Sequence, residues 1–524
     1  MERNITIGIL NNFRKYGILY LLFLTATCYL LLLVSFRQTD VFYLGDGGVK
    51  FMMVKQISAG ESFRYITNAQ PGWVKELWGR GFFPMAEPFV YLKPQGYVFV
   101  FPPAFELISA FFYRRFGYTG LYIIPFISTL LLWCGVIALA IRMSFSTRQT
   151  AVILLLVVFC SPLTFYGAVF WEHIPAMFLL LGGILFIACP PEKAWHAAIL
   201  GIISGLSFWI RPECLFVNFI IIGVCAWLNI KKLTSIHYSF FIGCLMSSAS
   251  YLIFNKIEYG GFFGIHGLQV VADKDHFVKV KLLIHNALSI NLLLVEYYPV
   301  ILLMIPILVA RLKFHWPLRS RTVALLLIVL IYCLLGRFIF PTYRNDGGKQ
   351  WGPRFFLPVI PLIALICIDT YIQWMPLLTA RYKRILVLFT GLAVAYSFGL
   401  NTVFGARDLY KDNYDRVRPC LAFVKQQQER VIVVNSDFVT MELGSLFREK
   451  NFFLSRDTAH FNQLLPLLKM HGVDHFIYIN DGGLPDGFTK ILSSYKVQMV
   501  AKGSYQTGLF SLDQRDSTDR ARAL

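Results

Sequence analysis

Apolar segments of about 20 residues recur along the sequence, and they constrain the fold more than any other feature. Each one, as a helix, is long enough to cross roughly 30 Å of hydrocarbon. Of the 524 residues, 56% are apolar and only 15% are charged, against roughly 25% charged in an ordinary soluble domain. The alternating ten-residue segments of a membrane barrel are not seen. The sequence therefore predicts a polytopic α-helical membrane protein.

These segments predict about eleven transmembrane helices. One further apolar stretch, 97–113, contains Pro102-Pro103 near its middle. If that stretch crossed the membrane, every later loop would change sides, so we expect it to form a helix at the outer interface instead. The predicted spans are 17–36, 121–141, 151–167, 174–189, 196–210, 213–230, 237–256, 295–310, 322–340, 355–373 and 385–403.

The distribution of basic residues predicts the orientation. With eleven crossings, the connections on the N-terminal side hold most lysines and arginines, as the positive-inside rule requires of the cytoplasmic side. We therefore expect a multi-pass protein of the inner (cytoplasmic) membrane with a cytoplasmic N-terminus. The net charge of +19 follows mainly from this topology, so nucleic acid is not an expected partner. The basic connections hold Arg14/Lys15, Arg142/Arg148, Lys193, Lys231/Lys232, Arg311/Lys313/Arg319/Arg321 and Arg381/Lys383/Arg384.

The chain is expected to have two parts. Residues 1–403 form a transmembrane module with long outer loops at 37–120 and 257–294, and residues 404–524 form a small extracytoplasmic α/β domain. In this tail, "VIVVNSD" and "HFIYIN" are strand-like and "FNQLLPLLKMHG" is helical, while "YKVQMVAKGSYQTGLFSL" has the pattern of a closing hairpin. No catalytic motif is visible in the tail.

Asp46 lies in "VFYLGDGGVKFMM", directly after the first predicted span. One interpretation is an N-cap of a helix that starts near Gly48, because an aspartate there accepts hydrogen bonds from the first backbone N–H groups. The other interpretation is a general base at the depth of the lipid headgroups. The two interpretations are compatible.

Cationic residues also occur in the predicted outer loops, against the positive-inside bias. Arg344, Lys349 and Arg354 lie in "YRNDGGKQWGPRFFLPVIPL", Lys93 lies near the membrane plane, and Arg211 lies between two apolar runs in "WIRPECL". Guanidinium and ammonium groups bind phosphate oxygens, so an anionic ligand is predicted here. Snorkelling and an ion pair with the neighbouring glutamate are the alternatives for Arg211.

Acidic and histidine residues on the same side are candidates for acid, orienting or metal-binding roles. Glu172 and His173 occupy a short outer turn in "FWEHIPAM", and Glu87 lies in the first outer loop. A solvated cap and a plain loop acid are the alternatives. The cysteines have neither CxxC nor paired spacing, so a zinc site is not indicated. A divalent metal ion would be compatible with the carboxylates, and His266 or His276 would be a further ligand. The metal stays unknown, and no other cofactor is expected.

Taken in order, five segments resemble the C-type glycosyltransferase (GT-C) superfamily. The likeness is to bacterial relatives of the protein O-mannosyltransferases and aminoarabinose lipid A transferases (family 39-like), and it spans roughly residues 1–403. The segments are "YLGDGGVKFMMVKQISAG", "FPPAFELISAFFYRRFG", "WEHIPAMFLLL", "GLSFWIRPE" and "GGKQWGPRFFLPVIPLIAL".

The resemblance implies transfer of a sugar from a polyprenyl-phosphate carrier to an acceptor hydroxyl on the extracytoplasmic face, with inversion. The acceptor would be a glycan, a lipid or a protein. Asp46 matches the catalytic base of the superfamily, and Arg354 would stabilise the leaving phosphate, with Lys93 and Arg211 as weaker matches. Gly47 and Phe101 depart from the residue types common in relatives, which argues against a metal site in the first loop.

The main alternative from another class is a transporter or flippase of a lipid-linked sugar. Transporters tend to carry ionisable residues at mid-membrane and a two-fold repeat, and neither is visible in the sequence. A non-catalytic receptor would give the outer charged residues no role. An O-antigen-type polymerase or ligase is a further alternative among enzymes, and the early aspartate in a long first loop favours the GT-C interpretation.

Overall fold

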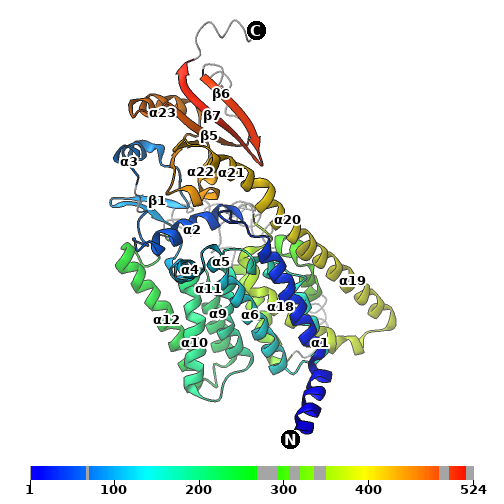
Figure 1. Ribbon diagram of the computed structural model, residues 1–524. Helices are drawn as coiled ribbons and strands as arrows, with labels where there is room; N and C mark the ends of the chain where they lie inside the picture. The colour runs from blue at the N-terminus through cyan, green and yellow to red at the C-terminus, as the bar shows by residue number, and fades with distance from the viewer. Residues whose placement is uncertain are drawn as a thin grey trace. The chain divides into compact units, whose positions relative to one another are not determined.

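The computed structural model describes residues 2–66, 70–265, 267, 292–305, 319–335, 350–482 and 495–514 (Figure 1). Contacts divide the chain into two compact units. The first, here called the helical unit, comprises Met1–Ser35 and Tyr122–Arg407, and the second, the sheet unit, comprises Phe36–Leu121 and Asp408–Leu524. The first outer loop and the tail, which are far apart in the sequence, therefore belong to one unit.

Apolar helices form nearly all of the described part of the helical unit. Five stretches are long and apolar enough to cross a membrane: Tyr16–Ser35, Tyr118–Arg142, Ser235–Tyr259, Arg354–Leu377 and Ala380–Gln426. Shorter apolar helices lie at five more predicted spans, while the count of eleven stays a prediction. The helices are α1 (Glu2–Ser35), α6 (Ile123–Arg142), α7 (Thr147–Val158), α8 (Leu163–Gly167), α9 (His173–Ala188), α10 (Ala194–Ile210), α11 (Cys214–Leu228), α12 (Ser235–Tyr259), α17 (Ser320–Leu335), α18 (Ile360–Trp374) and α19 (Ala380–Phe398).

The predicted continuous span at 151–167 is wrong in one respect. Helix α7 ends at Val158 and α8 starts only at Leu163. Pro162 lies between them, and a proline cannot donate the backbone hydrogen bond that a continuous helix requires there. The predicted span at 295–310 is described only as far as residue 305, where Pro299–Leu303 form the short 3-10 helix η2.

Small residues allow α10 and α12 to pack with their backbones in close contact (Figure 1). A Cβ atom at Gly201 of α10 would lie 2.2 Å from the carbonyl oxygen of Phe240, and one at Gly243 of α12 would lie 2.4 Å from that of Ala198. Either approach excludes any larger residue. Such small-residue contacts are the usual means by which membrane helices associate, because lipid tails give little hydrophobic driving force between helices.

Polar contacts place three helix ends at the same end of the helical unit. The guanidinium of Arg321, at the start of α17, donates to the Arg142 carbonyl at the end of α6 (3.0 Å). Arg319 lies 3.3 Å from the buried carboxylate of Asp369, near the end of α18. The connections around residues 142 and 319 therefore share one side, in agreement with the predicted alternation of loops. Which side faces the cytoplasm stays a prediction.

The tail contributes a five-stranded sheet to the sheet unit. The strand order is β4-β3-β5-β7-β6, in which β4, β3 and β5 are parallel and β5, β7 and β6 are antiparallel. The predicted strands, helix and hairpin are found at their positions, whereas β4 was not anticipated because its apolar run, Phe452 to Leu454, is only three residues long. The elements are α21 (Arg418–Gln426), β3 (Val431–Val434), α22 (Asp437–Glu442), β4 (Asn451–Leu454), α23 (Thr458–Met470), β5 (His475–Asp481), β6 (Tyr495–Lys502) and β7 (Tyr505–Gln514).

The first outer loop contributes helices and a hairpin to the same unit. Its main elements are α2 (Leu44–Ser58), α3 (Gly72–Leu77), β1 (Val90–Lys93), β2 (Gly96–Phe99) and α4 (Pro103–Phe116). The predicted helix over 97–113 is wrong for its first residues, because the alternating sequence from Tyr97 pairs with β1 as a strand. The helix starts at Pro103, the position at which a proline is tolerated. Leu107, Ile108 and Phe111 of α4 are exposed, which fits the predicted position at the membrane interface.

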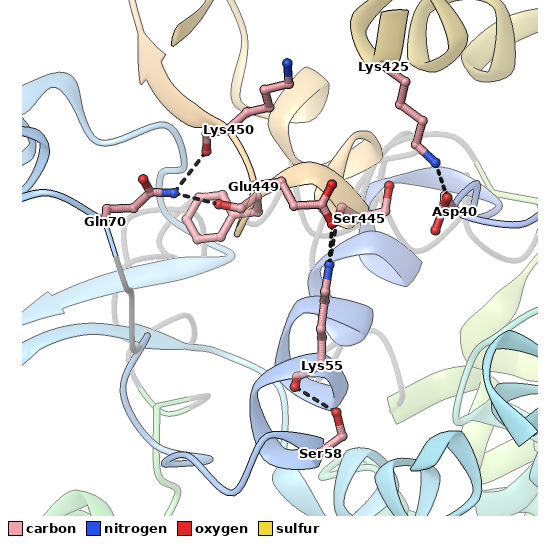
Figure 2. Close-up of polar contacts among 9 residues, drawn as sticks. Asp40, Lys55, Ser58, Gln70, Lys425, Ser445, Glu449 and Lys450 are labelled. Carbon is pink, nitrogen blue, oxygen red and sulfur yellow. Dashed lines mark hydrogen bonds and ion pairs between the residues drawn. The ribbon is translucent and has the colours of Figure 1, made fainter. Parts of the chain in front are cut away.

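Loop and tail share one apolar core, in which Met52 and Trp78 of the loop pack with Val433 and Phe453 of the tail. Figure 2 shows polar contacts between the same two segments. Among them, Lys55 Nζ contacts Glu449 Oε1 (3.0 Å) and the Ser445 carbonyl (3.1 Å), Gln70 donates to the carbonyls of Phe447 (3.3 Å) and Lys450 (3.1 Å), and Lys425 pairs with Asp40. The tail thus holds the loop that carries Asp46.

Candidate functional site

Asp46 lies inside helix α2, not before it. The helix begins at Leu44, and its N-cap, Tyr43, makes no side-chain capping hydrogen bond. The N-cap interpretation of Asp46 is therefore wrong, because α2 begins two residues upstream of it. The carboxylate lies in the first turn, where the helix dipole favours negative charge, and the residue is only 7% exposed. Leu44 has φ of 62°, a left-handed conformation that is costly for a branched side chain.

A glycine fixes α2 against the tail. A Cβ atom at Gly48 would lie 1.8 Å from the carbonyl oxygen of Met441, in α22, so only glycine fits there. Gly444 of the tail is also close to α2, because a Cβ atom there would lie 2.8 Å from the carbonyl oxygen of Gly48. The "GDGG" motif therefore serves close packing of α2 on α22, and this packing sets the position of Asp46 within the sheet unit.

Lys50 is a candidate site residue that the sequence analysis missed. It is 1% exposed, and its Nζ lies 4.2 Å from the centroid of the Phe101 ring, as in a cation–π contact. Residues four apart share one face of a helix, so Asp46 and Lys50 lie on the same side of α2. The signal in the sequence was this spacing, in a segment too apolar to suggest a buried ammonium.

Lys93 and Glu87 lie in the hairpin region of the same unit. Lys93 is the last residue of β1 and pairs with Gly96 of β2, and it is half-buried. Glu87 lies in the turn that precedes β1 and is exposed. This exposed position agrees with the interpretation of Glu87 as a plain loop acid.

In the helical unit, Arg211 contacts two other predicted site residues, Glu172 and His173, and also Glu213. Its Nη1 donates to Glu172 Oε1 (2.7 Å) and lies 2.8 Å from His173 Nε2, while its Nε donates to Glu213 Oε1 (2.6 Å). Glu172 and His173 are 5% and 3% exposed, so these two side chains are almost completely buried. The anticipated Arg–Glu ion pair exists, and a second carboxylate joins it. We call these four residues the Arg211 cluster.

Arg354 lies beside this cluster, at the start of the 3-10 helix η4 (Arg354–Val359). Its guanidinium carbon lies 5.1 Å from the Phe355 ring centroid and 5.6 Å from that of Trp171. The Tyr332 hydroxyl donates to the Phe355 carbonyl (2.5 Å), which fixes this backbone turn. Together with Arg211, Arg354 lines a cavity of about 20 Å³, room for about one water molecule.

The structure therefore brings Glu172, His173, Arg211 and Arg354 together, in the helical unit. Asp46, Glu87 and Lys93 belong to the sheet unit. Arg344 and Lys349 lie outside the described residues, as do His266 and His276.

The Arg211 cluster does not suit a metal ion. Among the residues that the structure describes, no group of three or more His, Cys, Asp or Glu side chains is arranged to hold one. The carboxylates of Glu172 and Glu213 both pair with the Arg211 guanidinium, which occupies the position between them that a metal ion would need. These residues therefore do not fit a metal centre.

Comparison with known proteins shows the fold. No protein-family model matches the sequence, and no curated protein is significantly similar to it. Two crystal structures of ArnT from Cupriavidus metallidurans have the same fold, one bound to undecaprenyl phosphate (TM-score 0.55) and one in the apo state (TM-score 0.57). Each is 10% identical and covers 94% of this chain and 98% of the ArnT chain. The chain thus has an ArnT-like fold along nearly its whole length.

Proposed function

We propose that this protein is an integral-membrane glycosyltransferase of the GT-C type. It would move a sugar from a polyprenyl-phosphate carrier to an acceptor hydroxyl on the extracytoplasmic face of the inner membrane. The observation that carries the proposal is the ArnT-like fold, because an ArnT structure with that fold holds undecaprenyl phosphate. The acceptor is a glycan, a lipid or a protein, and the tail, 404–524, lies on the extracytoplasmic side.

Asp46 is the proposed general base. Its carboxylate accepts the proton of the acceptor hydroxyl while that oxygen attacks the anomeric carbon. The bond from the anomeric carbon to the phosphate oxygen breaks on the opposite face, its electron pair stays on the phosphate, and the anomeric configuration inverts. The fixed placement of α2 by Gly48 and Met441 supports this role, because a base must be held within hydrogen-bond reach of the proton it takes.

Arg354 is the proposed ligand of the leaving phosphate, on which negative charge builds as the bond breaks. Two carboxylates within 2.7 Å already balance the charge of Arg211, so Arg354 is the better candidate of the two. The cavity beside it admits about one water molecule, so it must widen to take a phosphate. Lys93, and Arg344 and Lys349 in the outer loop before Arg354, would add positive charge to the same donor.

Lys50 is proposed to position Asp46 rather than to take part in the reaction. Burying either charge alone would be costly, and an opposite charge on the same helix face offsets that cost. Lys50→Met should therefore lower kcat without removing donor binding, and Lys50→Arg should restore part of the loss.

The direct test uses inner-membrane vesicles that contain the protein and tritiated undecaprenyl-phosphate hexoses and pentoses. If the proposal is right, label leaves the carrier and appears on an acceptor, and undecaprenyl phosphate accumulates. A flippase would instead move the labelled donor across the membrane with its sugar still attached. That second result would replace the enzyme by the transporter.

A further inference from the structure

A second cavity, of about 300 Å³, opens between the first outer loop and the tail within the sheet unit. This volume is at the lower end of that of small-molecule sites. The proposed transfer reaction uses none of its residues. We call it the Tyr97–His460 pocket, and it is lined by Gly81, Phe83, Met85 and Tyr97 of the loop and by Leu454, Arg456, Asp457 and His460 of the tail.

One part of the pocket is aromatic and rigid. The rings of Phe83 and Tyr97 are stacked, with centroids 3.5 Å apart and planes 7° apart. The Tyr97 hydroxyl donates to the Trp78 carbonyl (3.0 Å), which holds the ring in place. Met85 and Leu454 beside them are each 4% exposed. Because Phe83, Met85 and Leu454 are nearly fully buried, the half-buried Tyr97 ring is the part of this side that the C–H groups of a ligand would contact. A ring held in this way loses little conformational entropy on binding.

The other part of the pocket is polar. Asp457 is the N-cap of α23, and its Oδ1 accepts a hydrogen bond from the His460 backbone N–H (2.7 Å), which fixes the carboxylate. The His460 ring stacks on Phe82, with centroids 4.4 Å apart. Burial lowers the pKa of His460, against the opposing effect of Asp457. At neutral pH the imidazole is therefore neutral and offers one donor and one acceptor.

The combination of groups selects the ligand. Arg456 supplies only donors, Asp457 supplies only acceptors and His460 supplies both, while the two formal charges cancel. Hydroxyl groups, which donate and accept at once, match such a wall, whereas an anion would meet the Asp457 carboxylate. The apolar faces of a sugar ring match the opposite, aromatic side.

We infer that the Tyr97–His460 pocket is a binding site for a neutral saccharide. The identification of this saccharide as part of the acceptor rests on the proposed function. The binding of a saccharide does not. A pocket of this kind in the sheet unit would hold a glycan by residues other than those that act on the donor.

The test measures saccharide binding to the full chain in lipid nanodiscs, free of maltoside and glucoside detergents that would themselves compete. The probes are the methyl glycosides of mannose, glucose and galactose, titrated by saturation-transfer NMR. Arg456 is exposed, so Arg456→Ala should fold normally. Arg430→Ala is the matched control, because Arg430 is an exposed arginine of the same unit that does not line the pocket. Asp457→Asn keeps an N-cap residue and removes only the charge.

At least one glycoside should bind the wild-type chain and Arg430→Ala equally. Binding should weaken about tenfold in Arg456→Ala and in Asp457→Asn, since each variant removes a hydrogen bond between a charged group and the ligand. Absence of binding for all three probes, equal binding in Arg456→Ala and Arg430→Ala, or displacement of the glycoside by inorganic phosphate would each overturn the inference. Sugar transfer is measured separately, so intact saccharide binding without transfer would contradict only the proposed function.

Discussion

The helical unit and the sheet unit each contain one arginine between two carboxylates, and the comparison shows what such a cluster means. In the helical unit, Arg211 lies between Glu172 and Glu213. In the sheet unit, Arg416 contacts Asp412 (2.7 Å) and Glu442 (2.5 Å). We call the latter the Arg416 cluster.

The two clusters differ in their surroundings. Arg354 lies beside the Arg211 cluster and lines a cavity with it. The Arg416 cluster instead joins structural elements, because the Arg416 guanidinium also donates to the Tyr505 hydroxyl at the start of β7 (3.3 Å). The arginine and its carboxylates therefore do not by themselves mark a functional site. Arg354 and the cavity beside it distinguish the Arg211 cluster from the Arg416 cluster.

The largest expected effect is on stability, and it should be similar in the two clusters. Arg211→Met and Arg416→Met each leave two carboxylates, at least one of them buried, without their cation, which is expected to destabilise the protein by about 3–5 kcal/mol. Thermal unfolding of the purified variants in detergent would measure the loss. A variant that unfolds at the wild-type temperature would show that its cluster is solvated and not structural.

The pH dependence of stability should expose the Arg416 cluster. Burial raises the pKa of Glu442 from 4.5 to about 7, although the Arg416 guanidinium opposes the rise. A carboxyl group with a raised pKa stabilises the fold fully below its unfolded value, and this contribution is lost as pH rises through the folded value. The free energy of unfolding should therefore fall by roughly 3 kcal/mol as the pH rises from 4.5 to 7 and Glu442 ionises.

Glu442→Gln removes this group and is the matched variant for that prediction. The difference in unfolding free energy between wild type and Glu442→Gln should change across pH 4.5–7 and be flat outside it. Chemical denaturation at several pH values would measure it. A constant difference across the whole range would mean that folding does not raise the pKa of Glu442.

The packing of α2 gives a smaller expected effect. Gly48→Ala places a Cβ atom 1.8 Å from the Met441 carbonyl oxygen, and such overpacking typically costs about 1–3 kcal/mol. Gly72→Ala is the control, because nothing lies within 4 Å of the added atom there. Limited proteolysis of the tail should rise in the first variant only. Equal protection of both would show that α2 and α22 are not held by this contact.

The smallest expected effect separates Arg354 from Arg211. Arg354 is half-buried against aromatic rings, so Arg354→Met should destabilise the fold far less than Arg211→Met. Its affinity for undecaprenyl phosphate should nevertheless fall by about tenfold, the loss of one charge-assisted hydrogen bond. Native mass spectrometry of lipid retention would measure this. Unchanged retention would remove Arg354 from the donor site.

The sequence allowed prediction of those features that depend on local pattern. Apolar length predicted the positions of most apolar helices, and short apolar, strand-like runs predicted β3, β5 and the β6–β7 hairpin. Where a proline interrupts an apolar run, as between α7 and α8, hydropathy alone joined two helices into one.

Tertiary contacts were beyond prediction from the sequence. The contact of Gly48 with Met441 joins segments almost 400 residues apart, and no local pattern announces it. The burial of Lys50 and the Arg416 cluster likewise depend on which surfaces pack together. Asp46 was predicted as a site residue from its place after the first span, but its position inside α2 required the structure.

The proposed function depends most directly on Asp46, and one measurement tests it. Purified protein is given acceptor membranes and a tritiated undecaprenyl-phosphate sugar that the wild type uses, and the release of undecaprenyl phosphate is followed in Asp46→Asn. The control is Glu76→Gln, which alters an exposed carboxylate of the same loop. We predict that Asp46→Asn binds the donor but transfers sugar about 10²–10⁴-fold more slowly, with Glu76→Gln unaffected. Transfer at the wild-type rate by Asp46→Asn would contradict the proposed mechanism.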